Sequence, residues 1–298
     1  MLRLDEKKIR KGKAIGLPYV GSKKKISKKI VEIIKQNVGT DKTVYDVFGG
    51  GGAITAELMI NGMDVVYNDL DKTITDMFNR VLRQDREWIK TLIVSRDEFF
   101  TIRDKEHKAV DDELKLLVNS FGNDRKSYLY SKKISDIKYN LAVEIIKKDN
   151  VFSGYKQTTT YKKSSYKKID KNDRLQQLQR LEQLERLQQL EQLEQLNTYP
   201  KTSNKDYHHF YDVKDSILYL DPPYENSDTD DYNSQVDYAE FYDWAYEISK
   251  NNVVLLSSYE VSDDRFECVY EFKTARSTMA GGIAGKRTEK LFTVKGSS

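Results

Sequence analysis

The sequence predicts an α/β sheet domain that is built from both ends of the chain, with a basic and mainly helical module inserted in the middle. Two observations predict this fold class. Residues 43–68 read as strand, glycine turn, helix and strand, which is the opening of a βαβ unit. Strand-like and helix-like patterns resume at Ser216, after a long stretch in which the hydrophobic periodicity is weak.

In the first half of the chain, residues 23–37 predict a helix, because four isoleucines fall at i, i+4, i+7 and i+8 and lysines occupy the other faces. Residues 43–47 form a short β-rich run that stops at a glycine-rich turn. We expect a helix over 53–61, a second strand over 63–68 and further helix over 71–94.

The second half begins with residues 216–220, a near-continuous apolar run that is typical of a strand covered on both faces. A helix over 238–250 and strands over 253–258, 266–272 and 288–294 follow. These patterns complete the sheet domain that residues 43–68 begin.

The domain boundaries follow from where the α/β pattern stops and restarts. We expect a sheet domain over 1–110 and 198–298 and an inserted module over 111–197. Within this insert, residues 154–168 have little to bury, so we expect a loop or β-ribbon there.

Residues 174–196 of the insert form a low-complexity repeat in which every third residue is leucine. Every residue type in it is a strong helix former, so we expect a helix. Successive leucines step back by about 60° around such a helix, so the coiled-coil spacing of alternating three and four is absent, and a long 3₁₀-helix is rare. The leucines then face protein on several sides, or some are exposed. The repeat is either an expansion within a tolerated helix or a dimerisation element.

Composition places the chain among folded, soluble proteins. The 298 residues carry 50 Lys and Arg against 47 Asp and Glu, and the 20 Tyr and 11 Phe are more than a disordered chain would hold. A single cysteine, Cys268, excludes a disulfide framework and a cysteine-based zinc cluster, and with only 3 histidines we expect no metal. No apolar run approaches the roughly 20 residues of a membrane span and the N-terminus does not read as a signal peptide, so we expect a cytoplasmic protein without a membrane partner.

A glycine-rich turn over residues 48–52 (FGGGG) closes one predicted strand and opens a helix. Without side chains there, a ligand can approach the backbone and the free N–H groups of the helix N-terminus. Asp69 ends the next strand, where α/β nucleotide folds place a carboxylate that accepts hydrogen bonds from ribose hydroxyls. The pattern fits a dinucleotide or an S-adenosylmethionine site, and a turn without a ligand is the structural alternative.

The turn Asp221-Pro222-Pro223-Tyr224 at the carboxyl end of a predicted strand is the sharpest signal in the chain. Two prolines fix φ and lack N–H groups, so the turn is rigid and its carbonyls stay available. In open α/β sheets ligands bind at this edge. Asp221 and the Pro222 carbonyl each suit one N–H of the amino group of a planar base, and Tyr224 suits stacking on its ring. A tight turn with a capping aspartate is the alternative.

Together the two turns resemble the Dam-type DNA adenine-N6 methyltransferases, in the motif order of the α group of amino-methyltransferases and closest in character to phage-encoded members. Residues 17–23 (LPYVGSK) resemble the N-terminal cofactor motif of that family, 204–207 (NKDY) an element before its catalytic strand, and 288–292 (TEKLF) its closing strand. Asp46 departs from the Glu-Pro of many relatives but keeps a carboxylate. The resemblance implies a Rossmann-like S-adenosylmethionine-dependent methyltransferase sheet domain with an inserted target-recognition domain.

The same resemblance implies a reaction and its residues. The reaction is transfer of a methyl group from S-adenosylmethionine to the N6 amino group of an adenine flipped out of duplex DNA. Target-adenine contacts are implied for Asp221, Pro222 and Tyr224. Cofactor contacts are implied for Tyr19, Lys23, Asp46, Phe48, Gly50, Gly52 and Asp69. Structural alternatives are core packing for Phe48, solvated charge for Lys23 and a helix-end carboxylate for Asp46.

The insert is expected to hold the duplex. Asn123 and Arg125 are side-chain types that read base edges in the major groove. Phosphate contacts are expected from Lys162, Lys163, Lys167 and Lys168. The alternative is a solvated lysine face without a partner.

The net charge of +3 does not exclude a DNA partner, because it hides a separation of charge. Residues 1–43 and residues 125–171 each hold 13 basic and 4 acidic residues, whereas residues 221–250 hold 9 acidic residues and one lysine. The distribution predicts DNA on the basic segments.

Other functions stay open at this point. A DNA cytosine-N4 methyltransferase is the nearest, although that group more often carries Ser before Pro-Pro-Tyr; RNA or protein-glutamine methylation usually goes with Asn. A nicotinamide-dependent dehydrogenase would explain only residues 48–69, and a non-catalytic DNA-binding or decoy protein only the basic segments. A restriction endonuclease partner or a stand-alone role, and a monomer or a weak dimer, are all compatible with the sequence, in a prokaryotic cell or a phage-infected host.

Overall fold

The chain forms two compact units. The structure, a computed structural model, describes residues 1–19, 21–166, 180–225, 236–272 and 288–296. Unit 1 comprises residues 1–14, 23–75 and 200–298, and unit 2 comprises residues 15–22 and 76–199. None of the helices in the described ranges is long and apolar enough to span a bilayer.

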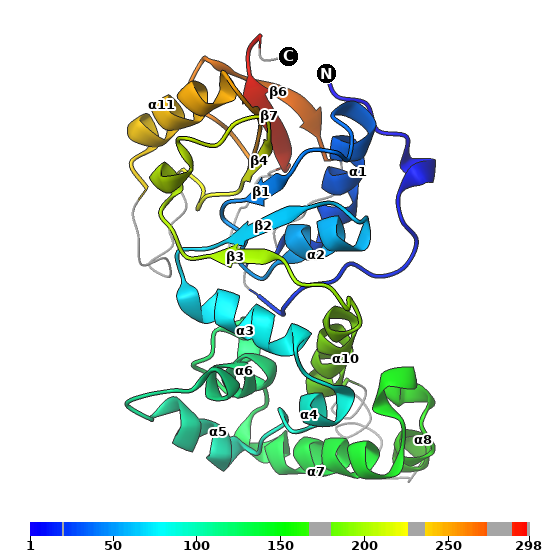
Figure 1. Ribbon diagram of the computed structural model, residues 1–298. Helices are drawn as coiled ribbons and strands as arrows, with labels where there is room; N and C mark the ends of the chain where they lie inside the picture. The colour runs from blue at the N-terminus through cyan, green and yellow to red at the C-terminus, as the bar shows by residue number, and fades with distance from the viewer. Residues whose placement is uncertain (20, 167–179, 226–235, 273–287, 297–298) are drawn as a thin grey trace. The chain divides into compact units, whose positions relative to one another are not determined.

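Unit 1 is built on a sheet that has seven strands among the described residues, in the order β3-β2-β1-β4-β5-β7-β6 (Figure 1). The first five strands in this order are parallel, and β7 runs antiparallel to β5 and β6. The order reverses between β1 and β4, because the chain moves outward from β1 to β3 before it returns to β4. The strands are β1 (Val44–Asp46), β2 (Val65–Asn68), β3 (Lys201–Ser203), β4 (Ile217–Leu220), β5 (Val253–Ser258), β6 (Phe266–Glu271) and β7 (Lys290–Val294).

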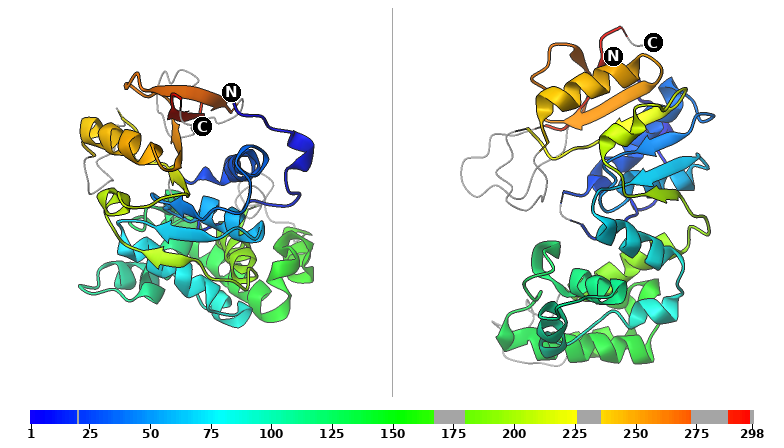
Figure 2. Two further views of the ribbon diagram at one scale, coloured as in Figure 1. Left: turned by 45° about the horizontal axis from the view of Figure 1, so that its top comes forward. Right: turned by 60° about the vertical axis from the view of Figure 1, so that its left-hand side comes forward.

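Helices cover both faces of this sheet, and residues along β4 alternate between two cores. Ile217 and Tyr219 pack with α1 and α2, whereas Leu218 and Leu220 pack with α11 on the other face. Figures 1 and 2 show α11 on the opposite side of the sheet from α1 and α2. The period of two explains why the whole strand is apolar. The helices are α1 (Ser27–Asn37), α2 (Ala53–Ile60) and α11 (Tyr238–Ser249).

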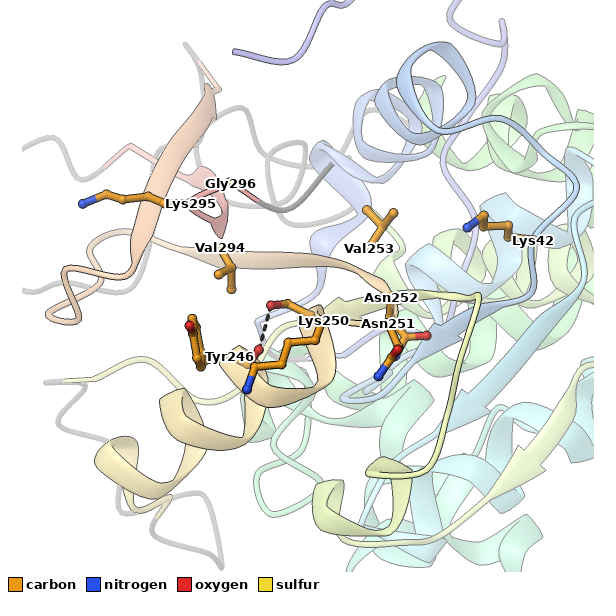
Figure 3. Close-up of a pocket in the computed structure, with 10 residues that line it drawn as sticks. Lys42, Tyr246, Lys250, Asn251, Asn252, Val253, Val294, Lys295 and Gly296 are labelled. Atoms are coloured by element: carbon orange, nitrogen blue, oxygen red, sulfur yellow. Dashed lines mark hydrogen bonds between the residues drawn. The ribbon is translucent and has the colours of Figure 1, made fainter.

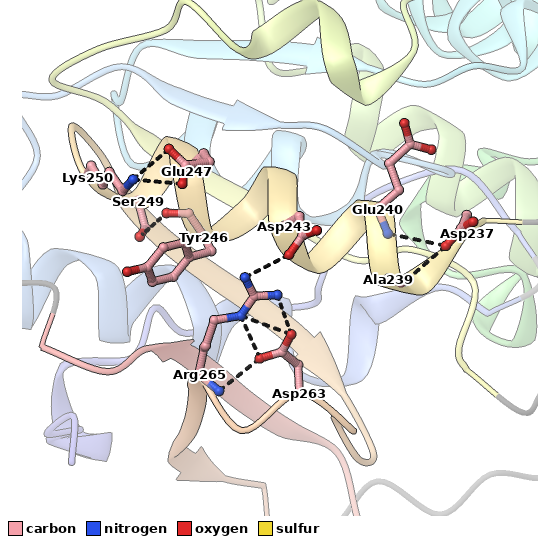
Figure 4. Close-up of polar contacts among 10 residues, drawn as sticks. All are labelled: Asp237, Ala239, Glu240, Asp243, Tyr246, Glu247, Ser249, Lys250, Asp263 and Arg265. Atoms are coloured by element: carbon pink, nitrogen blue, oxygen red, sulfur yellow. Dashed lines mark hydrogen bonds and ion pairs between the residues drawn. The ribbon is translucent and has the colours of Figure 1, made fainter.

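Charged side chains fix α11 at its start and along its exposed face (Figure 4). Asp237 caps the helix, because its carboxylate accepts hydrogen bonds from the N–H groups of Ala239 and Glu240. Arg265 lies 2.7 Å from the Asp243 carboxylate and also pairs with Asp263. The loop before β6 is therefore tied to α11.

Unit 2 is mainly helical in its described part. One core cluster joins α5, α6 and the segment that follows α6, through Phe99, Ile102, Leu116 and Tyr128. The helices are α3 (Lys72–Leu82), which begins in unit 1, α4 (Arg86–Lys90), α5 (Arg96–Arg103), α6 (Val110–Asn119), α7 (Lys132–Lys148), α8 (Thr159–Tyr166) and α10 (Glu182–Glu194). The predicted fold class, an α/β sheet domain with a mainly helical insert, is confirmed.

The leucine repeat is described from residue 180, and its earlier part lies outside the described residues. Because the repeat has a period of three, its leucines point to several sides of α10. Other residues of unit 2 cover them on these sides. Arg186 is buried on the same helix and donates hydrogen bonds to the carbonyls of Leu117, Val118 and Ser120 at 2.7–3.0 Å. The leucines with no exposed surface are Leu181, Leu184, Leu187, Leu190 and Leu193.

Some local expectations were wrong. Residues 159–166 form helix α8 instead of a loop or β-ribbon, because Thr158 caps it by accepting a hydrogen bond from Tyr161 N–H and the buried Tyr155 packs on the Tyr161 ring. The helix expected over 71–94 is two helices, since Asp85 caps a new one.

The boundary between the compact units falls at residues 75 and 76, whereas the sequence patterns placed it at 110 and 111. Residues of α5 explain the difference, because Phe99 and Ile102 pack in the same core as Leu116. The functional assignment of the two parts, a catalytic domain and a target-recognition domain, stays a prediction.

Candidate active site

The carboxyl ends of three parallel strands bring three aspartates to one edge of the sheet. Asp46 is the last residue of β1, Asp69 follows β2, and Asp221 follows β4. β1 pairs with both β2 and β4, so the three strand ends are neighbours. Since the strand order reverses between β1 and β4, this edge is the topological switch point at which open α/β sheets bind ligands.

The glycine-rich turn brings bare backbone to this edge. A Cβ on Gly49 would lie 2.4 Å from the ring of Tyr67, so only glycine fits there. Gly50 and Gly52 have φ values of +46° and +68°, in the left-handed region that favours glycine. Gly52 is the N-cap of α2. The turn therefore needs glycine for close packing at one position and for backbone conformation at two others.

Asp46 and Asp69 are anchored by the turn and by α2. The Oδ2 atom of Asp46 accepts hydrogen bonds from Thr55 N–H at 3.1 Å and from Thr55 Oγ1 at 2.6 Å. Its Oδ1 atom has no hydrogen-bond partner among the described residues, although the side chain is almost fully buried. Asp69 accepts a hydrogen bond from Gly50 N–H at 2.8 Å. Burial raises the pKa of both carboxyls, that of Asp46 to about 7, and the nearby Asp221 adds to the effect on Asp46.

Asp221 and Tyr224 belong to a largely buried cluster of charged and polar groups. Lys23, in the 3₁₀ turn η2 (Lys23–Lys25), places its Nζ atom 2.8 Å from Asp221 Oδ1 and donates a hydrogen bond to the Tyr224 hydroxyl. That hydroxyl donates to Glu289 Oε1 at 2.6 Å. The ring of Tyr224 packs on that of Tyr259, with centroids 4.5 Å apart. The Asp-Pro-Pro-Tyr turn is thus fixed at its first and last residues.

Burial and charge oppose each other at Asp221. Burial raises the pKa of Asp221, Lys23 lowers it and Glu289 raises it, and the result is a pKa of about 6. Burial lowers the pKa of Lys23, but Asp221 and Glu289 together outweigh burial and leave that pKa above its ordinary value. At pH 7 the pair is therefore a carboxylate and an ammonium group.

The other residues of the predicted site differ in their surroundings. Phe48 is half-buried, and its ring lies 5.9 Å from that of Phe241 and 6.2 Å from that of Tyr207, so it joins the aromatic core on the α11 face. Pro222 is buried. Tyr19 belongs to unit 2, whereas the other predicted cofactor residues belong to unit 1. The roles of these residues stay predictions.

The two predicted base-reading residues lie in a short turn that the bridge between Ser120 and Tyr128 closes. Asn123 and Arg125 both have left-handed backbone conformations, with φ values of +65° and +58°. The Arg125 guanidinium lies 3.1 Å from the carboxylate of Glu113. The left-handed conformations and this ion pair shape the turn.

The lysines expected to contact phosphate fall into two groups. Lys162 and Lys163 lie on α8 and are exposed. Lys167 and Lys168 lie outside the described residues. DNA contact by any of them stays a prediction.

A separate pocket of about 450 Å³ lies at the opposite, amino edge of the sheet (Figure 3). It is lined by Val253 at the start of β5 and by three lysines, two of which already have acidic partners. Lys42 pairs with Asp215, and Lys250 with Glu247. The charged groups at the carboxyl edge, and not this pocket, make the candidate active site.

Sequence reasoning did not find the partners that hold the site. Glu289 lies in a stretch that resembled relatives, yet nothing in its sequence neighbourhood indicated a contact with Lys23, which is far away in the chain. Thr55 and Ser257 are ordinary polar residues of a helix and a strand. The contact of Glu289 with the site follows only from the sheet topology, which places β5 beside β4 and β7 beside β5.

The strand order, the glycine turn and the Asp-Pro-Pro-Tyr turn at the switch point define a Rossmann-like methyltransferase fold. A family model described as D12 class N6 adenine-specific DNA methyltransferase matches residues 19–263. The chain belongs to this family, and it is therefore a DNA adenine-N6 methyltransferase. The resemblance to that class of enzymes is confirmed, whereas the phage-like character stays a prediction.

Two other comparisons add little. Among curated proteins, none matches the chain. Among solved structures, a protein from Haemophilus influenzae with a provisional assignment as a methylase matches with 9% identity and a TM-score of 0.34, over 91% of this chain and 96% of its own. That likeness is too distant to bear on function.

Proposed function

We propose that the enzyme transfers a methyl group from S-adenosylmethionine to the N6 atom of an adenine flipped out of duplex DNA, with Asp221 as the central hydrogen-bond acceptor. One observation carries this assignment. Asp221 begins a turn with two prolines at the switch point, and its buried carboxylate is paired with Lys23 at 2.8 Å. A fixed, ionised hydrogen-bond acceptor is what an aromatic amino group needs in order to react as a nucleophile.

The chemistry follows from the weakness of that nucleophile. The lone pair of an adenine amino group is delocalised into the ring, and S-adenosylmethionine, when bound, supplies an electrophilic methyl group. Asp221 and the Pro222 carbonyl each accept one N–H, which favours the tetrahedral geometry in which the lone pair is available. They also stabilise the positive charge that develops on N6 as the new N–C bond forms. The bond between the methyl group and the cofactor sulfur would break in the same step, S-adenosylhomocysteine would leave, and the surplus proton on N6 would then pass to water. Tyr224 stacks on the base.

Lys23 has a definite task in this proposal. Without it, burial and the neighbouring carboxylates would favour the protonated form of Asp221, which accepts hydrogen bonds poorly. Lys23 therefore keeps Asp221 ionised at neutral pH. This role differs from the cofactor contact expected for Lys23, which stays a prediction, because the ammonium group already faces Asp221, Tyr224 and Glu289.

The residues at the glycine turn fit S-adenosylmethionine. The unpartnered Oδ1 atom of Asp46 suits a ligand that brings an N–H group or a positive charge, and S-adenosylmethionine carries an ammonium and a sulfonium. Gly50 and Gly52 leave the backbone accessible, and Asp69 suits ribose hydroxyls. No metal ion takes part in this proposal.

The duplex requires a further step. Base pairing hides the amino group, so the adenine leaves the stack before methylation. The target-recognition role falls to unit 2, with base reading by Asn123 and Arg125 and phosphate contact by Lys162, Lys163, Lys167 and Lys168. We propose that the enzyme acts in the cytoplasm of a prokaryotic cell or a phage-infected host, as a monomer or weak dimer, with or without a restriction endonuclease partner.

The test is the variant Asp221→Ala, assayed for transfer of labelled methyl from S-adenosylmethionine to adenine in duplex DNA. We expect a loss of about 10³-fold or more, because the acceptor of the developing charge is gone. DNA affinity should stay within about threefold of the wild-type value, since one buried acceptor contributes little to phosphate binding.

Asp212→Ala serves as the matched control, because Asp212 is an exposed aspartate of the same unit. It should methylate at the wild-type rate. Full activity in Asp221→Ala would overturn the proposal.

A further inference from the structure

We propose that Glu289 is a positioning residue for methyl transfer, which acts on the adenine site through Tyr224 and Lys23. The inference rests on the proposed function of Asp221 and Tyr224. It concerns a residue outside both turns, which sequence reasoning did not select.

The sheet holds Glu289 firmly at the carboxyl edge. The residue immediately precedes β7, and its carbonyl accepts a hydrogen bond from Phe272 N–H at 2.9 Å. The next residue, Lys290, pairs with Ser258 of β5. Glu289 is therefore held between β5 and β6, and only 4% of its surface is exposed.

One carboxylate oxygen of Glu289 collects three donors. Its Oε1 atom accepts hydrogen bonds from the Tyr224 hydroxyl at 2.6 Å and from Ser257 Oγ at 2.8 Å, and it lies 3.5 Å from Lys23 Nζ. Tyr224 is thereby fixed at its hydroxyl end, opposite the turn that fixes its backbone. The orientation of the ring that stacks on the base depends on this contact.

The hydrogen bonds to Tyr224 and Ser257 do not explain why residue 289 is a charged glutamate. A glutamine oxygen would accept the same hydrogen bonds from Tyr224 and Ser257 without burying a second carboxylate beside Asp221, and buried like charges are unfavourable. A neutral residue would not attract Lys23. With Glu289 present, Lys23 has a second partner, so it stays in the cluster when the adenine amino group occupies Asp221.

A pH profile distinguishes this role from a merely structural one. The described titratable groups that face Asp221 are Lys23, Glu289, Asp46, Tyr219, Tyr224 and Tyr238. Glu289 raises the pKa of Asp221 and Lys23 lowers it. With S-adenosylmethionine kept saturating, so that the titration of Asp46 does not limit cofactor binding, we expect the acid limb of the methylation rate to report ionisation of Asp221. Removing the charge of Glu289 or that of Lys23 should then shift that limb in opposite directions.

The experiment measures single-turnover methylation of duplex DNA between pH 5 and pH 9 for Glu289→Gln and Lys23→Met. For Glu289→Gln we expect a rate constant about tenfold to a hundredfold lower on the plateau, and an acid limb about one pH unit lower. For Lys23→Met the acid limb should move upward. DNA KM should not change in Glu289→Gln, since the residue acts at the reacting base.

Glu267→Gln is the matched control, because Glu267 is an exposed glutamate on β6 of the same sheet. A Glu289→Gln variant with the wild-type rate and pH profile would overturn the inference, and so would one that loses thermal stability and activity together. Asp221→Ala separates the two proposals, since activity in that variant overturns the proposed function, whereas an inactive Asp221→Ala beside an unaffected Glu289→Gln overturns only the role of Glu289.

Discussion

Helix α10 and the carboxyl edge of the sheet both bury charged side chains, but they compensate them differently. On α10, Arg186 donates to three main-chain carbonyls at the end of α6, where the helix dipole is negative. At the sheet edge, the carboxylates of Asp221 and Glu289 share one lysine, and Asp46 Oδ1 has no donor within the described part of the chain. The hydrogen bonds of Arg186 are made within the protein. At the sheet edge, by contrast, a carboxylate oxygen is left that can accept a hydrogen bond from a ligand.

The two ways of compensating a buried charge indicate a structural role for α10 and a functional role for the sheet edge. A buried charge with a full set of partners contributes to one fixed structure, whereas buried carboxylates with raised pKa values are typical of sites that bind or react. Variants of α10 should therefore reduce the free energy of unfolding and leave the chemistry intact. Variants of the sheet edge should reduce binding or methylation and should not lower the free energy of unfolding.

The largest effect on stability is expected from Leu187→Ala in α10. Leu187 has no exposed surface, so its truncation leaves a cavity and should lower the free energy of unfolding by about 3 kcal/mol. The methylation rate per folded molecule should stay at the wild-type value. Urea denaturation followed by circular dichroism, together with single-turnover methylation, checks both parts.

Ile137→Ala is the control for this substitution, because Ile137 lies on α7 of the same unit with 48% of its surface exposed. Its free energy of unfolding should change by less than about 0.5 kcal/mol. If Leu187→Ala were as stable as the wild type, the repeat would be a tolerated expansion and not part of the core.

A smaller and opposite change is expected from Asp46→Asn at the sheet edge. The pKa of Asp46 is about 7 in the folded protein, against an ordinary value of 3.8 for an aspartate. The folded state therefore holds its proton more tightly than the unfolded state, so wild-type stability falls as the pH rises from about 4 to 7. The pKa difference alone corresponds to roughly 4 kcal/mol above pH 8. Because an amide oxygen accepts the hydrogen bonds from Thr55 less strongly than a carboxylate does, we expect the variant to raise the free energy of unfolding by about 2 kcal/mol above pH 8 and to have no effect below about pH 4.

The same variant should bind S-adenosylmethionine about tenfold more weakly, because the free acceptor is lost. Urea denaturation at pH 5 and pH 8 measures the free energy of unfolding, and titration calorimetry measures the affinity for S-adenosylmethionine. Asp212→Asn is the control at an exposed aspartate. A loss of stability that is equal at both pH values would contradict the assignment of Asp46 as a strained, ligand-directed carboxylate.

Sequence patterns predict most of the sheet and the three aspartates of the candidate active site. The predicted strand over 253–258 has the observed bounds, because its first four residues are a continuous apolar run of the kind that buried strands contain. β3 (Lys201–Ser203) was missed, since it is short, polar and at the sheet edge. The local motifs also located Asp46, Asp69 and Asp221, which topology then brings together.

The rest of the site depends on contacts between distant segments. Lys23 was selected for its motif, but its pairing with Asp221 and Glu289 is set by the order of strands and not by residues near it in the chain. The sequence predicts a loop or β-ribbon where α8 lies, because a composition rich in lysine, serine and threonine gives no sign that Tyr155 packs on Tyr161 of the helix. Tertiary contacts override local composition in both cases.

The smallest effect is expected from the exposed lysines of α8 in unit 2. The double variant Lys162→Ala with Lys163→Ala should weaken duplex DNA binding severalfold and leave the free energy of unfolding unchanged. If both lysines contact phosphates, the slope of log affinity against log salt should become shallower by about 2. Fluorescence anisotropy between 50 and 300 mM salt measures it.

The matched double variant is Lys205→Ala with Lys214→Ala, two exposed lysines of unit 1. Because phosphate contacts act additively and release counterions one by one, removing lysines that do not touch DNA should leave the slope unchanged. Equal slopes for the two double variants would contradict the assignment of the duplex to the surface of α8. A shallower slope for the α8 variant alone would identify an electrostatic surface, distinct from both buried clusters, that positions DNA without specifying its sequence.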